Sequence, residues 1–196
     1  MPIQFDLSKY NNNNIFIETG TYKGDGVQEA LRVGFKKIYS IELDITRFNS
    51  CTLMFKYNDN VTILHGDSSS VLPELLKQID EPVTLWIDAH YCADGAEIGD
   101  KWCPLKEELE AIKNHKIKNH TILIDDWRCM ENIHIDYTWA TQNTTGSKFS
   151  VDNKNGKEVG FLGKTNCYEK IKEINSDYKF TFENGTVKED VLVCKI

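Results

Sequence analysis

The sequence predicts an α/β fold in which one Rossmann-like sheet of seven strands, mostly parallel, carries helices on both faces. Five short apolar segments recur along the chain with helical patterns between them, which is typical of a parallel sheet with crossover helices. These segments are continuously apolar rather than alternating, as expected for strands buried on both faces. Residues 178–182 and 191–194, joined through Glu183-Asn184-Gly185, predict a closing hairpin whose last strand runs antiparallel.

The composition fits one domain spanning residues 1–196, with 40% apolar and 27% charged residues. The net charge of -7 and the lack of a basic stripe argue against nucleic acid as the main partner. No stretch approaches transmembrane length and the N-terminus lacks a signal-peptide pattern, so we expect a cytoplasmic protein without membrane insertion. The six cysteines form no C-x-x-C pair, which favours reduced thiols. The oligomeric state stays open, a homo-oligomer included.

A glycine-containing turn follows the first apolar segment, Ile15-Phe16-Ile17, and leads into a helical pattern from Val27. A strand, a glycine turn and a helix in this order place backbone N–H groups at the carboxyl end of the strand, where a nucleotide-like cofactor can bind. The spacing is E-x-G-x-x-x-G and not the dinucleotide G-x-G-x-x-G, and the carboxylate of Glu18 would repel a pyrophosphate but can hold a cation. The candidate residues of this turn are Glu18, Thr19, Gly20, Thr21 and Gly24.

The second predicted strand, residues 37–42, ends in an acid, Glu42, 22 positions after Gly20. In nucleoside-binding sheets such an acid accepts hydrogen bonds from the two ribose hydroxyls. Asp44 is expected to cap the helix that follows.

The third predicted strand, residues 61–65, leads into Gly66-Asp67-Ser68-Ser69. Asp67 is a candidate N-cap of the next helix, a role that Ser69 or Ser70 could fill instead. The resemblance described below gives Asp67 a second interpretation, and the sequence leaves the two open.

The fourth and fifth predicted strands, residues 83–87 and 121–124, are each followed by acids: Asp88 with His90, and then Asp125 with Asp126. Neighbouring parallel strands lie about 5 Å apart and open on the same crevice, so these carboxylates should gather there. They would repel one another unless a cation or a proton neutralised them. The sequence therefore predicts a site for Mg²⁺, or for Mn²⁺ or Ca²⁺. Arg128 is expected to form a salt bridge with the acids.

Residues 129–164 interrupt the strand–helix rhythm with a segment rich in Asn, Thr, Gly and Lys that also carries aromatic residues. A structureless segment of that length is unusual in a compact domain unless it covers a binding site. We predict that it is a lid on the substrate side of the site.

Five motifs stand at the ends of the predicted strands, and the first of them, together with the predicted sheet, resembles the class I S-adenosylmethionine-dependent methyltransferases. The five motifs are FIETGTYKGDG, YSIELD, HGDSS, WIDAHY and LIDDWRC. The E-x-G-x-x-x-G pattern resembles motif I of that family. Asp88 together with Asp125 and Asp126 resembles the metal triad of the small sugar-modifying, macrocin-type and catechol-type O-methyltransferases. The motifs are also similar to small bacterial and viral proteins described only as methyltransferase-like, some of them associated with surface glycans.

The resemblance implies the class I methyltransferase sheet and S-adenosyl-L-methionine as cofactor. The implied cofactor-binding residues are Glu18, Thr19, Gly20, Thr21, Gly24, Glu42, Asp67, Ser68 and Asp88, with Asp67 receiving the adenine amino group. The implied metal ligands are Asp88, Asp125 and Asp126.

The implied reaction is methylation of one hydroxyl of a vicinal diol whose two oxygens the metal chelates, on a sugar of a glycan or on a small-molecule diol such as a catechol. The implied catalytic residues are Asp88 and His90, with His90 as the base because its ordinary pKa lies near working pH. His90 follows Asp88 by two positions, whereas the base of the family follows its aspartate by three.

Two other hypotheses remain. The first is an NAD(P)- or nucleotide-sugar-binding Rossmann-like protein, against which the lack of G-x-G-x-x-G argues. The second is a non-catalytic module that binds S-adenosylmethionine. The three aspartates argue against that module, because their repulsion is unfavourable and nothing structural requires them.

Overall fold

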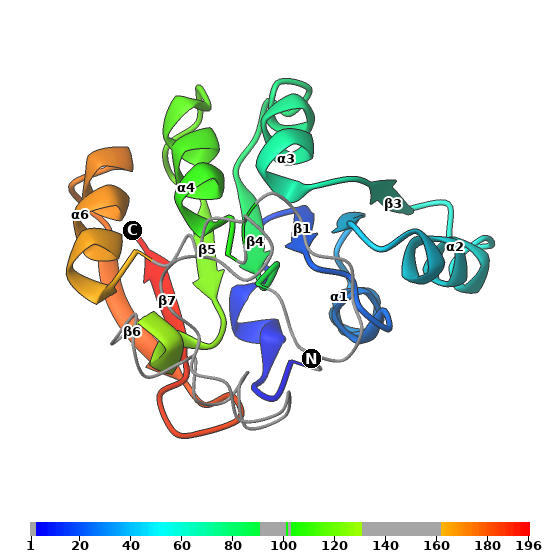
Figure 1. Cartoon of the computed structure of the whole chain (residues 1–196), viewed down its shortest axis with the longest axis horizontal. Coiled ribbons are helices and arrows are strands. Elements are labelled where there is room, and N and C mark those ends of the chain that lie inside the picture. The colour runs from blue at the N-terminus through cyan, green and yellow to red at the C-terminus, as the bar shows by residue number, and fades with distance from the viewer. Residues whose placement is uncertain (1–2, 91–100, 102, 131–161) are drawn as a thin grey trace.

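The computed structural model describes residues 3–90, 101, 103–130 and 162–196 of the chain. One seven-stranded sheet in the order β3-β2-β1-β4-β5-β7-β6 forms its centre (Figure 1). The strands are β1 (Ile15–Thr19), β2 (Lys37–Glu42), β3 (Val61–His65), β4 (Val83–Ile87), β5 (Thr121–Ile124), β6 (Lys179–Glu183) and β7 (Val191–Lys195). Strands β1 to β5 are parallel and β7 is antiparallel to both β5 and β6, which confirms the predicted fold class.

Helices cover both faces of the sheet (Figure 1). One face carries α3 (Ser68–Leu76), α4 (Leu105–Asn114) and α6 (Lys164–Ile174). The other carries the 3-10 helix η1 (Leu7–Tyr10), α1 (Asp25–Val33) and α2 (Ile45–Met54). A second 3-10 helix, η2 (Trp127–Met130), follows β5. Among the described residues, no helix is long and apolar enough to cross a membrane.

The continuously apolar strands contribute side chains to two cores at once. In β4, Leu85 packs into the core under α3, α4 and α6, whereas its neighbour Trp86 packs into the core under α1 and α2. Ile17 and Phe16 divide in the same way in β1. Burial on both faces explains why β1, β4 and β5 do not show the alternation of a half-exposed sheet. The same expectation is wrong for β3, which lies at the edge of the sheet and is only partly buried.

Helix starts follow the expected capping chemistry. Asp44 precedes α2 and accepts hydrogen bonds from the N–H groups of Thr46 at 2.8 Å and Arg47 at 3.0 Å, which confirms its predicted role as a cap.

The closing hairpin is also confirmed, although β6 begins at Lys179 and not at Tyr178. Tyr178 is fully buried, and its hydroxyl donates a hydrogen bond to the His120 carbonyl oxygen at 2.9 Å.

The predicted lid falls largely outside the described residues, since these omit 131–161. At its two ends, Cys129 and Met130 belong to η2, and Lys164 is the first residue of α6. The lid therefore stays a prediction.

Two buried histidines link the ends of α3, α4, β4 and β5. The Val83 N–H donates to Nδ1 of His120 at 3.1 Å, so the proton of His120 lies on Nε2, which is 2.9 Å from Nδ1 of His115. Nε2 of His115 in turn lies 3.0 Å from the Ile79 carbonyl oxygen. Burial, together with the neighbouring His115, lowers the pKa of His120 to about 4. This relay of hydrogen bonds therefore requires a neutral His120 ring.

We expect this relay to make the fold sensitive to acid. A histidine whose folded pKa is depressed contributes stability that is complete above its unfolded pKa of about 6.5 and is lost as the pH falls toward 4. Between pH 7.5 and pH 5 the loss from His120 should be about 2 kcal/mol. Urea unfolding at the two pH values should show that His120→Asn, which keeps an acceptor for Val83, loses less free energy of unfolding than wild type. The exposed His65→Asn should lose as much as wild type. Equal losses in wild type and His120→Asn would contradict the assignment.

Candidate active site at the carboxyl edge of the sheet

All the acids that the sequence singled out lie at one edge of the sheet. Glu18 and Thr19 end β1, Glu42 ends β2, and Asp88 follows β4. Asp125 and Asp126 follow β5. The parallel register sets the ends of neighbouring strands side by side, with Thr19 opposite both Ile41 and Ile87. The topology therefore gathers these side chains as expected, and their separate surroundings decide what each can do.

Glu18 lies beneath the glycine turn, 2% exposed. Its Oε2 accepts a hydrogen bond of 2.5 Å from the Ser40 hydroxyl, which lies 2.6 Å from the hydroxyl of Thr21. Burial raises the pKa of Glu18 to about 8. Gly26, in the first turn of α1, lies directly against this carboxyl group, since a Cβ there would be 1.8 Å from Oε1. Glu18 thus ties the turn to β2, and its role toward a cation of the cofactor stays a prediction.

Gly20 is required where β1 and β4 end together. Its φ is +87°, and a Cβ at this position would lie 2.4 Å from the carbonyl oxygen of Asp88. The amide of Asp88 returns a hydrogen bond of 3.1 Å to the Thr19 carbonyl oxygen. Gly24 has a φ of +83°, and a Cβ there would meet the Phe55 ring at 2.8 Å. The backbone of the turn consequently lies close to the aspartate that follows β4.

Glu42 organises the same turn from β2. Its Oε2 accepts the N–H of Tyr22 at 2.8 Å and its Oε1 accepts the N–H of Asp44 at 2.8 Å. Tyr22 has a φ of +52°, an uncommon conformation for a residue with a side chain, and this hydrogen bond holds it. Burial raises the pKa of Glu42. Each carboxylate oxygen keeps a second lone pair that can accept a ribose hydroxyl.

Asp67 is the N-cap of α3. Its Oδ1 accepts the N–H of Ser69 at 2.9 Å and the Ser69 hydroxyl at 2.6 Å, so the capping interpretation is confirmed. Ser68 follows as the first residue of α3 and is 5% exposed. Contact of Asp67 and Ser68 with a nucleoside stays a prediction.

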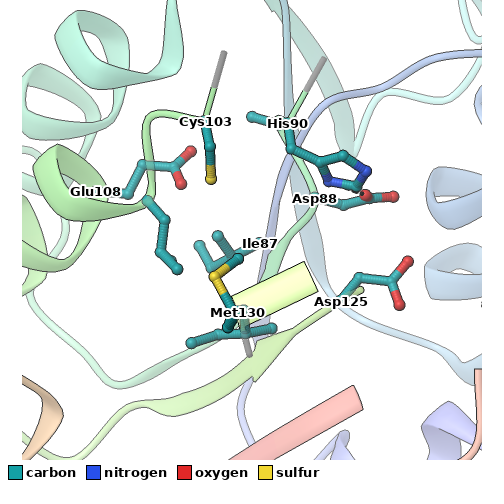
Figure 2. Close-up of a pocket in the computed structure, with 10 residues that line it drawn as sticks. Ile87, Asp88, His90, Cys103, Glu108, Asp125 and Met130 are labelled. Carbon is teal, nitrogen blue, oxygen red and sulfur yellow. Dashed lines mark ion pairs between the residues drawn. The ribbon is translucent and has the colours of Figure 1, made fainter. Parts of the chain in front are cut away.

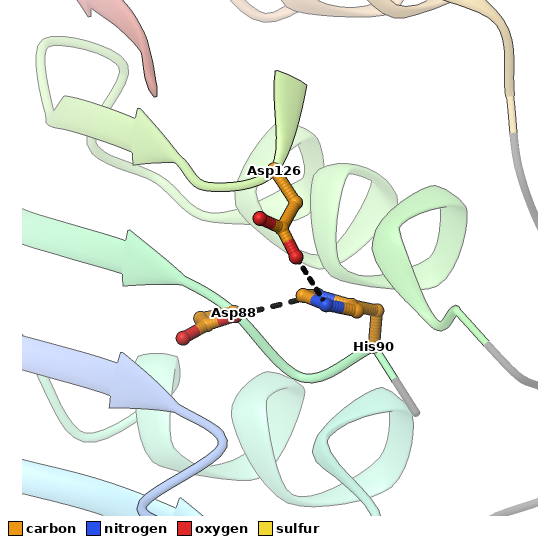
Figure 3. A group of neighbouring side chains, drawn as sticks. All are labelled: Asp88, His90 and Asp126. Carbon is orange, nitrogen blue, oxygen red and sulfur yellow. Dashed lines mark ion pairs between the residues drawn. The ribbon is translucent and has the colours of Figure 1, made fainter. Parts of the chain in front are cut away.

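His90 lies between two of the aspartates, as Figure 3 shows. Its Nδ1 is 3.3 Å from Oδ1 of Asp88 and its Nε2 is 2.5 Å from Oδ2 of Asp126. Burial opposes a charge on this ring, but Asp126, Asp88 and Asp125 outweigh it and raise the pKa of His90 to about 9. Burial also raises the pKa of Asp88. One ligand atom each from Asp88, His90 and Asp126 lie within 4.8 Å of one another, close enough to share a metal ion.

Asp125 belongs to a second group, because the backbone turns sharply after β5. Asp126 has a φ of +50°, and the metal-ligand atoms of Asp125 gather with those of Asp126 and Asp190. Burial, with Asp88 and Asp126 nearby, raises the pKa of Asp125 to about 7. The predicted ligands Asp88, Asp125 and Asp126 are thus divided between two groups that share Asp126, within the described part of the chain.

Asp190 is a fully buried acid that sequence reasoning missed. Arg128 donates to it from its backbone N–H at 3.3 Å and from its guanidinium group, which also lies 2.6 Å from Oδ1 of Asp126. The expected salt bridge of Arg128 is confirmed. Burial opposes ionisation of Asp126, but His90 and Arg128 lower the pKa of Asp126 to about 2. The predicted strand order could have identified Asp190, because the residue before an antiparallel β7 must lie beside the residues that follow β5.

A small recess, with room for about one water molecule, lies beside the aspartates (Figure 2). Asp88, His90 and Asp125 line one side of it, and Glu108 of α4 lines another. The apolar part of the wall comes from Ile87, Leu105, Ile124 and Met130. Glu108 is 1% exposed and was not among the candidates from the sequence.

Comparison with known proteins identifies the fold. No family model matches the chain, and no curated protein matches it in sequence. Among solved structures, an O-methyltransferase from Bacillus cereus in complex with SAH matches with a TM-score of 0.55 and 13% identity, over 97% of this chain and 77% of that one.

Two further solved structures show how widely this fold is shared. A candidate rRNA methylase from Clostridium thermocellum matches with a TM-score of 0.56 and 14% identity, over 97% of this chain and 93% of that one. Human N-acetylserotonin methyltransferase in complex with SAM matches with a TM-score of 0.51 and 15% identity over 97% of this chain, which spans 49% of the human chain. At these identities the likeness shows a methyltransferase-type fold.

The contact between Glu18 and α1 predicts an unusual effect of alanine. Gly26→Ala should lower the free energy of unfolding by about 1–3 kcal/mol, although alanine is the better helix former, because Glu18 or α1 must shift. Adding Glu18→Ala should remove most of that effect. Gly34→Ala is the control, with a φ of +89° and nothing within 4 Å, and should lose about 1 kcal/mol from backbone strain alone. Urea unfolding measures these four proteins and Glu18→Ala alone, and a Gly26→Ala protein as stable as wild type would refute the contact.

Proposed function

We propose that the chain is an S-adenosyl-L-methionine-dependent O-methyltransferase that acts on a vicinal diol, with a sugar of a glycan as the acceptor. The observation that carries the proposal is the arrangement of acids along one sheet edge. Glu18 and Glu42 lie at the ends of β1 and β2, where a nucleoside would bind, and Asp88, His90 and Asp126 form a group beside them. Solved structures with the same fold contain SAM or SAH, which supports the cofactor.

The glycine turn supports the cofactor assignment. Gly20 brings the ends of β1 and β4 into contact, so a ligand bound over the turn lies beside Asp88. Glu42 offers a carboxylate beside the turn, which suits a ligand with hydroxyl groups and disfavours a pyrophosphate, whereas Glu18 lies beneath the turn and burial raises its pKa to about 8.

A dinucleotide-binding protein is the weaker alternative. The sheet of such proteins has the strand order 3-2-1-4-5-6. Here the antiparallel β7 stands between β5 and β6. The net charge of -7 likewise disfavours an RNA acceptor.

The donor set at the edge fits a divalent ion. The acids form two overlapping groups, Asp88 with His90 and Asp126, and Asp125 with Asp126 and Asp190. Their carboxylates are the hard oxygen ligands that Mg²⁺, Mn²⁺ and Ca²⁺ prefer, and an ion at Asp126, which both groups share, would draw Asp88 and Asp125 toward it. When bound, the ion would lower the pKa of the attacking hydroxyl and hold the neighbouring oxygen of the diol.

We assign the proton transfer to His90. Burial opposes its charge, but Asp126 and Asp88 raise its pKa to about 9, so the ring must first release a proton before it can accept one from the acceptor hydroxyl. A divalent ion held by these aspartates would favour that release. The two ring nitrogens of His90 contact Asp88 and Asp126, which orient the ring at the edge of the recess. Asp88 has two roles, since its backbone meets the glycine turn and its carboxylate orients His90. Together these residues would align an acceptor oxygen with the methyl group of the donor.

Isothermal titration calorimetry tests the cofactor. SAH should bind with a dissociation constant in the micromolar range, whereas NAD and UDP-glucose should produce no heat of binding. Glu42→Gln should weaken SAH by about tenfold or more, because a charged hydrogen-bond acceptor for the ribose is lost. The exposed Glu74→Gln serves as the control. Binding of NAD but not of SAH would reject the proposal.

Electron paramagnetic resonance with Mn²⁺ tests the metal ligands. In the SAH-bound protein, Asp88→Asn and Asp125→Asn should each weaken Mn²⁺ by at least about tenfold, because even the outer partners of metal ligands contribute about 10- to 100-fold. SAH affinity should change little in Asp125→Asn, and the exposed Asp59→Asn should change neither. If Asp125→Asn bound Mn²⁺ as tightly as wild type, Asp125 would not be a ligand.

A further inference from the structure

Glu108 is a buried acid for which the proposed reaction has no use. It lies in α4, is 1% exposed, and its Oε1 is buried with no hydrogen-bond partner among the described residues. Burying a carboxyl oxygen without a partner is unfavourable, and an apolar side chain of similar size would pack there at lower cost. A residue that lowers stability in this way calls for a functional explanation.

The groups around Glu108 belong to the candidate cofactor site. The hydroxyls of Ser68, at the start of α3, and Thr19, at the end of β1, lie close enough to favour its ionised form. Ser68 Oγ is itself buried without a hydrogen-bond partner within the described ranges. The Ser68 hydroxyl and the Glu108 carboxyl group therefore lie within hydrogen-bonding reach but are not aligned as a complete hydrogen bond, and a small rotation would align them.

Among the described residues, the charged side chains near Glu108 are all acidic apart from His90. Asp67 faces it from α3 and Glu107 from its own helix, while Asp88, His90 and Asp125 line the same recess. Burial raises the pKa of Glu108 to about 7, so the group can act as an acceptor in either protonation state. Figure 2 shows its carboxyl group on the side of the recess opposite Asp125.

We propose that Glu108 is a positioning residue for the methyl donor, which accepts hydrogen bonds from Thr19 and Ser68 and so holds the end of β1 and the start of α3 at the spacing that the nucleoside requires. The inference rests on the proposed function, since it concerns the same cofactor. It assigns Glu108 no contact with the reacting atoms. It explains why an acid is retained at a place where an apolar residue would be more stable.

Calorimetric titration with SAH, together with thermal unfolding, tests the proposal on three variants. Glu108→Met should unfold at a higher temperature than wild type, because a buried carboxyl oxygen without a partner is gone, and should bind SAH at least about tenfold more weakly. Glu108→Gln keeps an acceptor oxygen and should bind within about threefold of wild type. Glu110→Met, on the same helix but half-exposed, is the matched control and should leave SAH affinity unchanged.

A positioning residue is distinguished from a structural one by two opposite changes in Glu108→Met, a gain in thermal stability and a loss of SAH affinity. A Glu108→Met protein that binds SAH as wild type does, or that loses stability or fails to fold, overturns the proposal. So does a tenfold loss in Glu108→Gln. Adding Ser68→Ala to Glu108→Met should weaken SAH by less than the sum of the single effects, and full additivity would count against the link. If wild type itself does not bind SAH, the proposed function fails first, and the two failures are thus distinguishable.

Discussion

The crowding of carboxyl groups at one edge of a parallel sheet is the constraint on which the rest of the structure depends. Five parallel strands end together, and the acids after them must each find a partner or keep a proton. Glu18 takes the Ser40 hydroxyl, Glu42 takes two backbone N–H groups, and Asp126 takes His90 and Arg128. These pairings differ in kind, which is why the pKa of Asp126 falls to about 2 while that of Asp125 rises to about 7.

Several of these acids also hold the loops on which they sit. Asp67 caps α3, and Glu42 fixes the left-handed residue Tyr22 in the glycine turn. A ligand at this edge would meet carboxylates that are already oriented, so little ordering would be needed on binding. The same arrangement limits what can bind, since a pyrophosphate would lie beside the carboxylate of Glu42, whereas ribose hydroxyls would find an acceptor there.

Asp190 and Glu108 are the two acids that the sequence analysis did not identify. Neither follows the carboxyl end of a parallel strand, which was the pattern used to find the others. Asp190 precedes the antiparallel β7, so it arrives at the edge from the opposite chain direction. Glu108 lies in the first turn of α4, where the helix dipole is ordinarily enough to explain an acidic residue. Only the packing of α4 against α3 and β1 shows that its carboxyl group is buried beside Ser68 and Thr19.

The sequence by itself determined the strands, their direction and the edge at which the acids collect, because doubly buried strands and glycine turns leave local patterns that need no knowledge of distant contacts. It predicted the bounds of β2 to β5 and the cap at Asp44 on those grounds. Only the tertiary structure decided how the acids are paired. Whether Asp88 faces Asp125 or His90 depends on the backbone turn at Asp126 and on the position of the His90 ring. The distances between these side chains are a few ångströms and arise from packing between segments far apart in the chain.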